Sequence, residues 1–135
     1  MKIGKRVRGL TFLHAAAADK QQIVQLQTRF FRKNTADYGM PVAHYIVHYA
    51  DGEKTEIPVK LGWHVHFWDC YAPARIMPGA RSFWTGFTTE AKRRDPNAPD
   101  ACLWTMEWKN SRPDTPIDHI TFTTTDTEAT VAILG

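Results

Sequence analysis

The chain lacks the features of a membrane protein and of a disulfide or metal scaffold. No apolar run approaches the roughly 18 residues of a membrane-spanning helix, and the N-terminus has no apolar signal core. The two cysteines, Cys70 and Cys102, form no CxxC pair, and their number fits a single disulfide as well as two free thiols. We therefore expect the chain as given to be soluble, without a membrane partner, and to carry no targeting segment.

The chain also lacks a large excess of either positive or negative charge. Lys and Arg number 17 against 14 Asp and Glu, so the formal net charge is only +3. The densest basic groups, at residues 5–8 and 92–94, are short and separate, whereas a phosphate-binding surface shows a clustered stripe of Lys and Arg. The charge balance therefore predicts no nucleic-acid partner.

Catalytic motifs are missing as well. The sequence contains no GxSxG, HExxH, P-loop or Rossmann glycine pattern. Glycoside hydrolysis needs two carboxyl groups roughly 5 to 10 Å apart, a pairing that the sequence does not define. A nucleophilic Cys70 beside a histidine competes with the commoner buried or disulfide-bonded state of a cysteine. We expect no enzymatic activity and no cofactor.

The composition that is present suits one globular domain over residues 1–135. Hydrophobic residues make up 43% of the chain and aromatic residues 12%, enough to bury a single core at this length. Residues 42–59 read as a β-hairpin, because Tyr45, Val47 and Tyr49 alternate with a second set of side chains before a turn at Asp51 and Gly52. Glycine accepts a positive φ without a Cβ clash, so this turn sets the register of the two strands.

Short alternating segments at about ten-residue spacing predict further strands. They cover residues 8–13, 60–68, 82–88, 101–108, 117–123 and 128–134. Stretches rich in Pro, Gly, Asn and Asp at residues 34–41, 71–80, 89–100 and 110–116 separate them as loops. Residues 19–33 place apolar side chains three and four apart, which predicts one short helix with Asp19 as its N-cap. The pattern predicts an all-β fold, an antiparallel β-sandwich or barrel with one short helical insertion.

Six stretches follow one another in a recognisable order: LTFLHA (10–15), YIVHYADG (45–52), EIPV (56–59), the segment 62–68, FWTG (83–86) and WKNSRPDTPIDHITF (108–122). Together they resemble a galactose-binding-like β-sandwich domain that occurs in secreted bacterial proteins and is attached to glycoside hydrolases. The resemblance implies a jelly roll, the architecture of many carbohydrate-binding modules. It also implies a secreted or periplasmic location.

The chain departs from this family in three places. The family usually has a further strand-containing segment before the part equivalent to residues 3–13, so we expect the chain to lack its N-terminal strand or strands. The stretch 17–41 is longer than the family's, and Trp63, His64 and His66 stand where its members often carry charged residues. The family offers no established ligand-binding residues, so the resemblance implies a class of function rather than a site.

His64 and His66 are the tightest pair of metal-binding side chains. Two apart in a predicted strand, they share a face and could ligate one metal ion, with His44, His48 or Asp51 as a third ligand. The glutamate that follows an HxH pair in cupin-type sites is absent. The alternative is two half-exposed histidines on the outer face of a strand, and we assign no metal ligand.

Five tryptophans raise the question of sugar binding. Sugar rings pack their C–H face on exposed aromatic side chains, while polar groups at the edge bind the hydroxyls. Trp68, Trp84 and Trp108 lie in the family-like stretches and are predicted mainly as core, whereas Trp63 and Trp104 are predicted to be exposed. The predicted ligand-binding residues are Trp63, His64, His66, Tyr71 and Arg75.

Three hypotheses of function follow. The leading one is a non-catalytic module that binds a polysaccharide or oligosaccharide, or packs against a neighbouring catalytic domain. The alternative is a structural or interaction domain that forms an interface with a partner or with itself, because an unpaired sheet edge invites a partner strand. The third is a small metal-dependent enzyme that uses His64 and His66.

Overall fold

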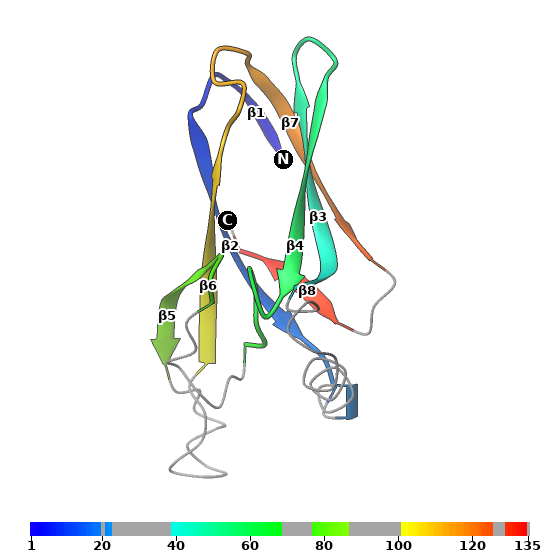
Figure 1. Ribbon diagram of the computed structural model, residues 1–135, viewed down its shortest axis with the longest axis vertical. Helices are drawn as coiled ribbons and strands as arrows, with labels where there is room; N and C mark the ends of the chain where they lie inside the picture. The colour runs from blue at the N-terminus through cyan, green and yellow to red at the C-terminus, as the bar shows by residue number, and fades with distance from the viewer. Residues whose placement is uncertain (20, 23–38, 69–76, 87–100, 126–128, 135) are drawn as a thin grey trace.

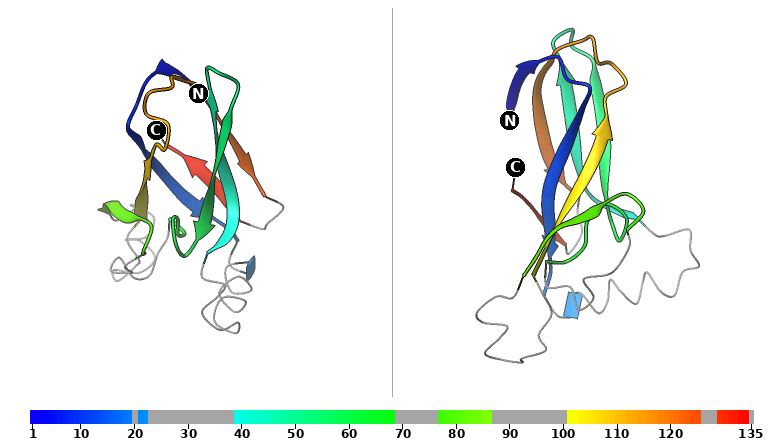
Figure 2. Two further views of the ribbon diagram at one scale, coloured as in Figure 1. Left: turned by 45° about the horizontal axis from the view of Figure 1, so that its top comes forward. Right: turned by 90° about the vertical axis from the view of Figure 1, so that its left-hand side faces the viewer.

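The computed structural model describes residues 1–19, 21–22, 39–68, 77–86, 101–125 and 129–134. Within those ranges eight strands pair antiparallel in two four-stranded sheets (Figure 1), and Figure 2 shows both layers from two further sides. Sheet A has the order β1 (Lys2–Lys5), β7 (Ile117–Thr124), β3 (Met40–Tyr49), β4 (Lys54–Leu61). Sheet B has the order β5 (Arg81–Gly86), β6 (Ala101–Lys109), β2 (Gly9–Ala17), β8 (Thr130–Ile133). The predicted all-β antiparallel sandwich is confirmed.

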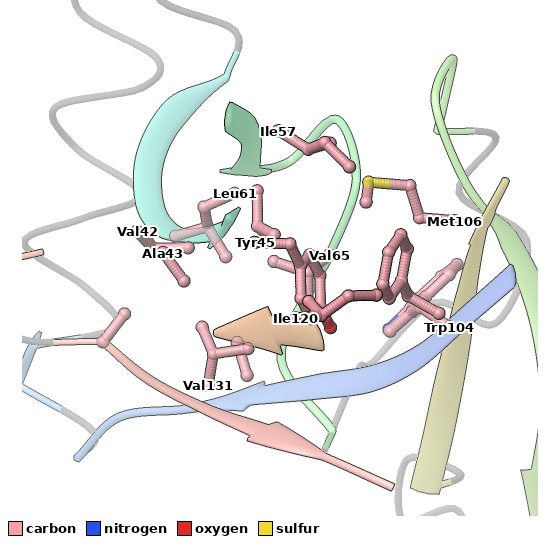
Figure 3. Close-up of a cluster of buried hydrophobic side chains, with 14 of the residues drawn as sticks. Val42, Ala43, Tyr45, Ile57, Leu61, Val65, Trp104, Met106, Ile120 and Val131 are labelled. Atoms are coloured by element: carbon pink, nitrogen blue, oxygen red, sulfur yellow. The ribbon is translucent and has the colours of Figure 1, made fainter. Parts of the chain in front are cut away.

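The inner faces of the two sheets meet in one hydrophobic core (Figure 3). Along β3 the side chains of Tyr45, Val47 and Tyr49 are buried, as their alternation predicts. Tyr45 of sheet A stacks on Phe12 of sheet B, with ring centroids 3.9 Å apart and an interplanar angle of 17°. Aromatic pairs add about 0.5–1.5 kcal/mol beyond the area that they bury, so this stack helps to hold the two sheets together.

The β3–β4 hairpin forms where the sequence predicts it. Gly52 N–H donates to the Tyr49 carbonyl at 3.0 Å, and Tyr49 N–H donates to the Glu53 carbonyl at 2.9 Å, so the loop has three residues. Gly52 has a φ of 90°, the left-handed conformation that closes such a loop and that glycine adopts without strain. The turn thereby sets the pairing of the two strands, which begins at His48 opposite Lys54.

A buried polar network joins three connections at the hairpin end of the sandwich, where Figure 1 shows the β3–β4 loop and the β6–β7 connection at the same end. Asn110 follows β6, is 3% exposed, and accepts hydrogen bonds from Tyr49 Oη at 2.7 Å and Arg112 N at 2.8 Å. Its Nδ2 donates to the carbonyls of Val7 at 2.9 Å and Arg112 at 3.2 Å. Arg112 also forms an ion pair with Asp51 in the hairpin loop. We call these contacts the Asn110 network; it ties the β1–β2, β3–β4 and β6–β7 connections together.

The prediction of one continuous strand over residues 60–68 is wrong. β4 ends at Leu61, and Gly62 adopts a φ of 77° at the start of a turn. A strand keeps alternate side chains on one face only while the backbone stays extended. Val65 and Phe67 are nevertheless buried, as their alternation predicts, whereas Trp63 is exposed.

After this turn the chain crosses from sheet A to sheet B. The pairing of β2 with β6 ends at His14 opposite Trp104. Beyond that point Trp68 N–H donates to the Ala16 carbonyl at 2.8 Å, and Cys102 N–H donates to the Trp68 carbonyl at 2.7 Å. The crossing segment thus takes a place between β2 and β6 where those strands no longer bond to each other.

The strand ends differ in detail from the prediction. β1 is not predicted as a strand, and β2 continues through the alanines to Ala17. At the predicted N-cap, Gln22 N–H donates to Asp19 Oδ1 at 2.8 Å and Asp19 N–H donates to Gln22 Oε1 at 3.0 Å, the reciprocal bonds of a capping box. The body of the predicted helix, residues 23–33, and the loop segments 71–76 and 89–100 lie outside the described residues.

Candidate functional site

Trp63 lies in a compact turn that follows β4. The Lys60 carbonyl accepts hydrogen bonds from His64 N at 2.8 Å and from Trp63 N at 3.2 Å. His64 Nδ1 accepts a hydrogen bond from the Lys60 N–H at 3.2 Å, which holds the imidazole beside the turn. Leu61 and Val65 on either side are 1% and 0% exposed, so both ends of the turn are anchored in the core. The turn therefore presents Trp63 outward from a fixed base.

Glycines on two sides make room for the Trp63 indole. Gly79 N–H donates to the Trp63 carbonyl at 3.1 Å, and a Cβ at Gly79 would overlap the rings of both Trp63 and His64. A Cβ at Gly39 would lie 2.9 Å from Lys60 Cδ and 3.5 Å from Trp63 Cβ, so a larger residue would crowd the Lys60 side chain. Trp63 nevertheless keeps 37% of its surface exposed, as predicted. We call the group Gly39, Lys60, Trp63, His64 and Gly79 the Trp63 site.

His14 ties the Trp63 site to the core. It is buried between the sheets, and its Nε2 lies 2.9 Å from the His64 carbonyl while its Nδ1 lies 3.2 Å from Tyr45 Oη. A carbonyl only accepts, so Nε2 carries the proton and donates, and Nδ1 accepts from the Tyr45 hydroxyl. Burial lowers the pKa of His14, although its hydrogen bond to the His64 carbonyl raises it. His14 is thus a neutral bridge between β2, β3 and the turn.

The polar groups of the Trp63 site are basic. Burial lowers the pKa of His64 most, and the nearby Lys60 and His14 lower it further, while a hydrogen bond with the Pro58 backbone raises it. Because Nδ1 accepts the Lys60 N–H, the neutral ring carries its proton on Nε2. Proline has no N–H, so the imidazole N–H donates to the Pro58 carbonyl. The Lys60 ammonium is therefore the donor that suits hydroxyl or carboxylate oxygens of a ligand.

The described residues do not gather the histidines that the metal-dependent hypothesis requires. His66 Nδ1 accepts a hydrogen bond from Phe67 N at 2.9 Å, and its ring packs edge-on to Phe67 and 6.3 Å from the Trp104 ring centroid. His44 lies 3.3 Å from a carboxylate oxygen of Glu56. Among the described residues no three His, Cys, Asp or Glu side chains are grouped to hold a metal ion. The metal-dependent hypothesis therefore has no ligand set in that part of the chain.

Three predictions for individual tryptophans are wrong. Trp68 and Trp84, predicted as core, are 44% and 48% exposed, and Trp104, predicted as exposed, is 1% exposed. Trp84 lies on β5, an edge strand that carries a bulge between Ser82 and Trp84. Trp104 lies on the central strand β6, where its side chain points into the core (Figure 3). Trp108 is half-buried against the core, in line with its prediction.

The predicted ligand-binding residues are only partly brought together. Trp63 and His64 adjoin each other over Gly79, whereas Tyr71 and Arg75 lie outside the described residues. Sequence reasoning missed Lys60, Gly39 and Gly79. The two glycines stand in predicted loops, and no periodicity in the sequence indicates which loops meet.

Comparisons of the chain with protein-family models, with curated proteins and with solved structures find no match. The class that the fold itself defines is an antiparallel sandwich of two four-stranded sheets. In the part of the chain that the structure describes, no helix has the length and apolar character needed to cross a membrane.

Proposed function

We propose that the protein is a non-catalytic carbohydrate-binding module whose ligand packs on Trp63. The observation that carries the proposal is the partly exposed indole of Trp63, fixed against Gly79 and flanked by Lys60 and His64. An aromatic platform takes the apolar C–H face of a sugar ring, and neighbouring donors bind its hydroxyl groups. The Lys60 ammonium is the donor at this site, and the His64 ring lies beside the indole.

The rigidity of the turn supports the same function. Buried Leu61 and Val65 anchor it on both sides, and His14 holds the His64 carbonyl from within the core. A ligand that binds to a preformed platform loses less free energy to the ordering of side chains. Such a platform binds without a catalytic group, which agrees with the absence of catalytic motifs from the sequence.

Binding to a glycan array and to soluble polysaccharides tests the proposal, with wild-type protein compared with Trp63→Ala. Trp84→Ala is the matched control, because its indole is also exposed but lies on β5. We expect affinity to fall by about tenfold or more in Trp63→Ala, since an aromatic stacking contact is lost. Trp84→Ala is expected to bind like wild type.

Gly79→Ala provides an independent variant in which Trp63 is retained. The added methyl group would displace the rings of Trp63 and His64, so affinity is expected to fall although the indole is still present. Circular dichroism checks that each variant is folded. The proposal is wrong if wild type binds no glycan, or if Trp63→Ala and Gly79→Ala both bind as tightly as wild type.

A second candidate, an interaction domain, is favoured by apolar side chains exposed on or beside sheet B: Trp68 at 44%, Phe83 at 65%, Trp84 at 48%, Ile133 at 41% and Leu134 at 54%. Phe83 and Trp84 lie next to each other on the edge strand β5, whereas Ile133 and Leu134 lie on or just after β8, the opposite edge of the sheet. Exposed apolar side chains mark protein contacts, and β5 adds backbone groups that a partner strand can pair with. If the interface is with a second copy, light scattering after size exclusion will show a dimer that a Phe83→Ser, Trp84→Ser double variant abolishes. A wild type that is monomeric at all concentrations would argue against self-association.

A further inference from the structure

A second surface, separate from the Trp63 site, lies on the outer face of sheet A. The strand register sets Lys54 of β4 opposite His48 of β3, His48 opposite His119 of β7, and His119 opposite Lys2 of β1. Each strand of the sheet thus contributes one basic side chain. Neighbouring strands lie about 4.8 Å apart, so these four residues form a row about 14 Å long across the sheet. We call it the basic row.

The basic row faces away from the core. His48 alternates with the buried side chains of β3 and therefore points outward. In β7, Ile117 and Ile120 are both buried although they are three apart, because the register shifts between His48 and the next residue of β3. This irregularity turns Asp118 and His119 to the outer face together.

The two imidazoles at the middle of the row are held in place. Their rings stack with centroids 4.0 Å apart and an interplanar angle of 13°. His48 Nε2 lies 3.0 Å from Thr121 Oγ1, and His119 Nδ1 lies 2.8 Å from Asp118 Oδ2. Each ring has a second nitrogen, Nδ1 of His48 and Nε2 of His119, that can donate to a ligand once protonated.

The charge of the row depends on pH. Two lysines and the Asp118 carboxylate give a local charge of +1 while both imidazoles are neutral, and protonation of both raises it to +3. Partial removal from water lowers the pKa of His48 most, His119 and Lys54 lower it further, and Asp118 raises it. On the same face of the sheet, a carboxylate oxygen of Glu56 of β4 lies 3.3 Å from the imidazole of His44 of β3.

We propose that the basic row binds a linear polysaccharide bearing sulfate or carboxylate groups, laid across the four strands of sheet A, and that binding tightens as acidification charges His48 and His119. Each strand then offers one cation to successive anionic groups, which is the geometry that a regularly charged chain fits. Nucleic-acid sites add aromatic or Arg side chains on which bases stack. The strands of sheet A show none of these on the described outer face, and the two imidazoles stack on each other.

Binding of dextran sulfate and of polygalacturonate, with uncharged dextran as reference, tests this at fixed low salt and at about pH 7.5 and about pH 5. The lower value lies well below the ordinary pKa of histidine because the pKa of His48 is lowered. We expect the anionic polysaccharides to bind on the order of tenfold more tightly at the lower pH, because two exposed charges each add a modest ionic contact. Uncharged dextran is expected to show no such change.

Variants separate the contribution of the two histidines to binding from that of the two lysines. The double variant His48→Gln, His119→Gln is expected to lose the pH dependence, whereas Lys2→Gln, Lys54→Gln is expected to bind more weakly at both pH values. His44→Gln is the matched control, because His44 lies on the same strand and face as His48 but its Nε2 lies 3.3 Å from a carboxylate oxygen of Glu56. It is expected to keep the pH dependence of wild type.

Several results would overturn the proposal. These are equal binding at both pH values, a pH dependence that survives in the double histidine variant or disappears in His44→Gln, and equally tight binding of single-stranded DNA at matched charge. If the double histidine variant does not fold, proton resonances of the His48 and His119 rings in wild type decide the matter, since they must shift on addition of dextran sulfate. Trp63→Ala must leave this binding intact, which keeps the test independent of the function proposed for the Trp63 site.

Discussion

Replacement of Asn110 with alanine is expected to lower the free energy of unfolding by about 3 kcal/mol. The side-chain amide makes four hydrogen bonds at a position that is 3% exposed. Alanine removes all four and leaves the buried Tyr49 hydroxyl without its acceptor. A buried polar group without a partner costs about 1–3 kcal/mol, and here the loss also separates the three connections that the Asn110 network holds together.

Equilibrium unfolding in urea, followed by circular dichroism, measures this effect. Tyr49→Phe removes one of the four bonds and is expected to cost about 1 kcal/mol. Asn110→Asp keeps both acceptor bonds but replaces the Nδ2 donor with an oxygen that faces the carbonyls of Val7 and Arg112, so we expect it to destabilise the fold about as much as alanine does. An Asn110→Ala variant that is no less stable than Tyr49→Phe would show that the network does not act as a unit.

Acidification from about pH 7 to about pH 5 is expected to destabilise the protein, with His14 as a main contributor. Burial lowers the pKa of His14 below its value in the unfolded chain, so the unfolded state takes up this proton at a higher pH than the folded state. Stability is therefore fully present above the unfolded pKa and is lost as the pH falls toward the folded pKa. The slope in that window is about 1.4 kcal/mol per pH unit for one group. His64, whose pKa burial also lowers, contributes in the same direction.

The hydrogen bonds of His14 explain why the charged form is disfavoured. Nδ1 of the neutral ring accepts from the Tyr45 hydroxyl, and Nε2 donates to the His64 carbonyl. A proton on Nδ1 would face a hydroxyl that now donates to it. The Tyr45 hydroxyl would have to turn away and lose its acceptor, while the new charge would lie between the two sheets.

His14→Gln tests this account, because its amide can both donate and accept. The variant is expected to be less stable than wild type at pH about 7 but to lose less stability between pH about 7 and about 5. Asp51→Asn is the control: the hydrogen bond from Arg112 holds the pKa of Asp51 below its usual range, so its contribution is lost only at a lower pH. If His14→Gln loses as much stability in this window as wild type does, the titrating group lies elsewhere.

Strand positions were largely predictable because alternation is a local property. The buried set of β3 and the buried set of β6 each repeat every two residues, and the hairpin loop ends in the glycine that its backbone requires. The prediction of a continuous strand over residues 60–68 was wrong because it relied on alternation alone. The side chains of these residues alternate in the sequence, but the backbone turns at Gly62, and alternation does not indicate such a turn.

The candidate site was predictable only in part. Trp63 and His64 were identified from residue type, and their partner Gly79 lies in a separate connection that the turn contacts. The basic row was less visible still. His48 and His119 belong to strands far apart in the chain, and only the register of β3 with β7 stacks their rings.

The sequence by itself determined that this chain is an all-β fold of antiparallel strands, because a two-residue period of apolar side chains commits each strand to one buried face. The division into two four-stranded sheets, rather than a barrel, came from the tertiary structure. The sequence also determined the hairpin between β3 and β4. Only the tertiary structure decided which aromatic side chains stay exposed and which histidines meet. Trp84 and Trp104 each lie in an apolar strand, yet one is exposed on the edge strand β5 and the other is buried on the central strand β6. Burial depends on the neighbours that a strand acquires, and those neighbours come from distant parts of the chain.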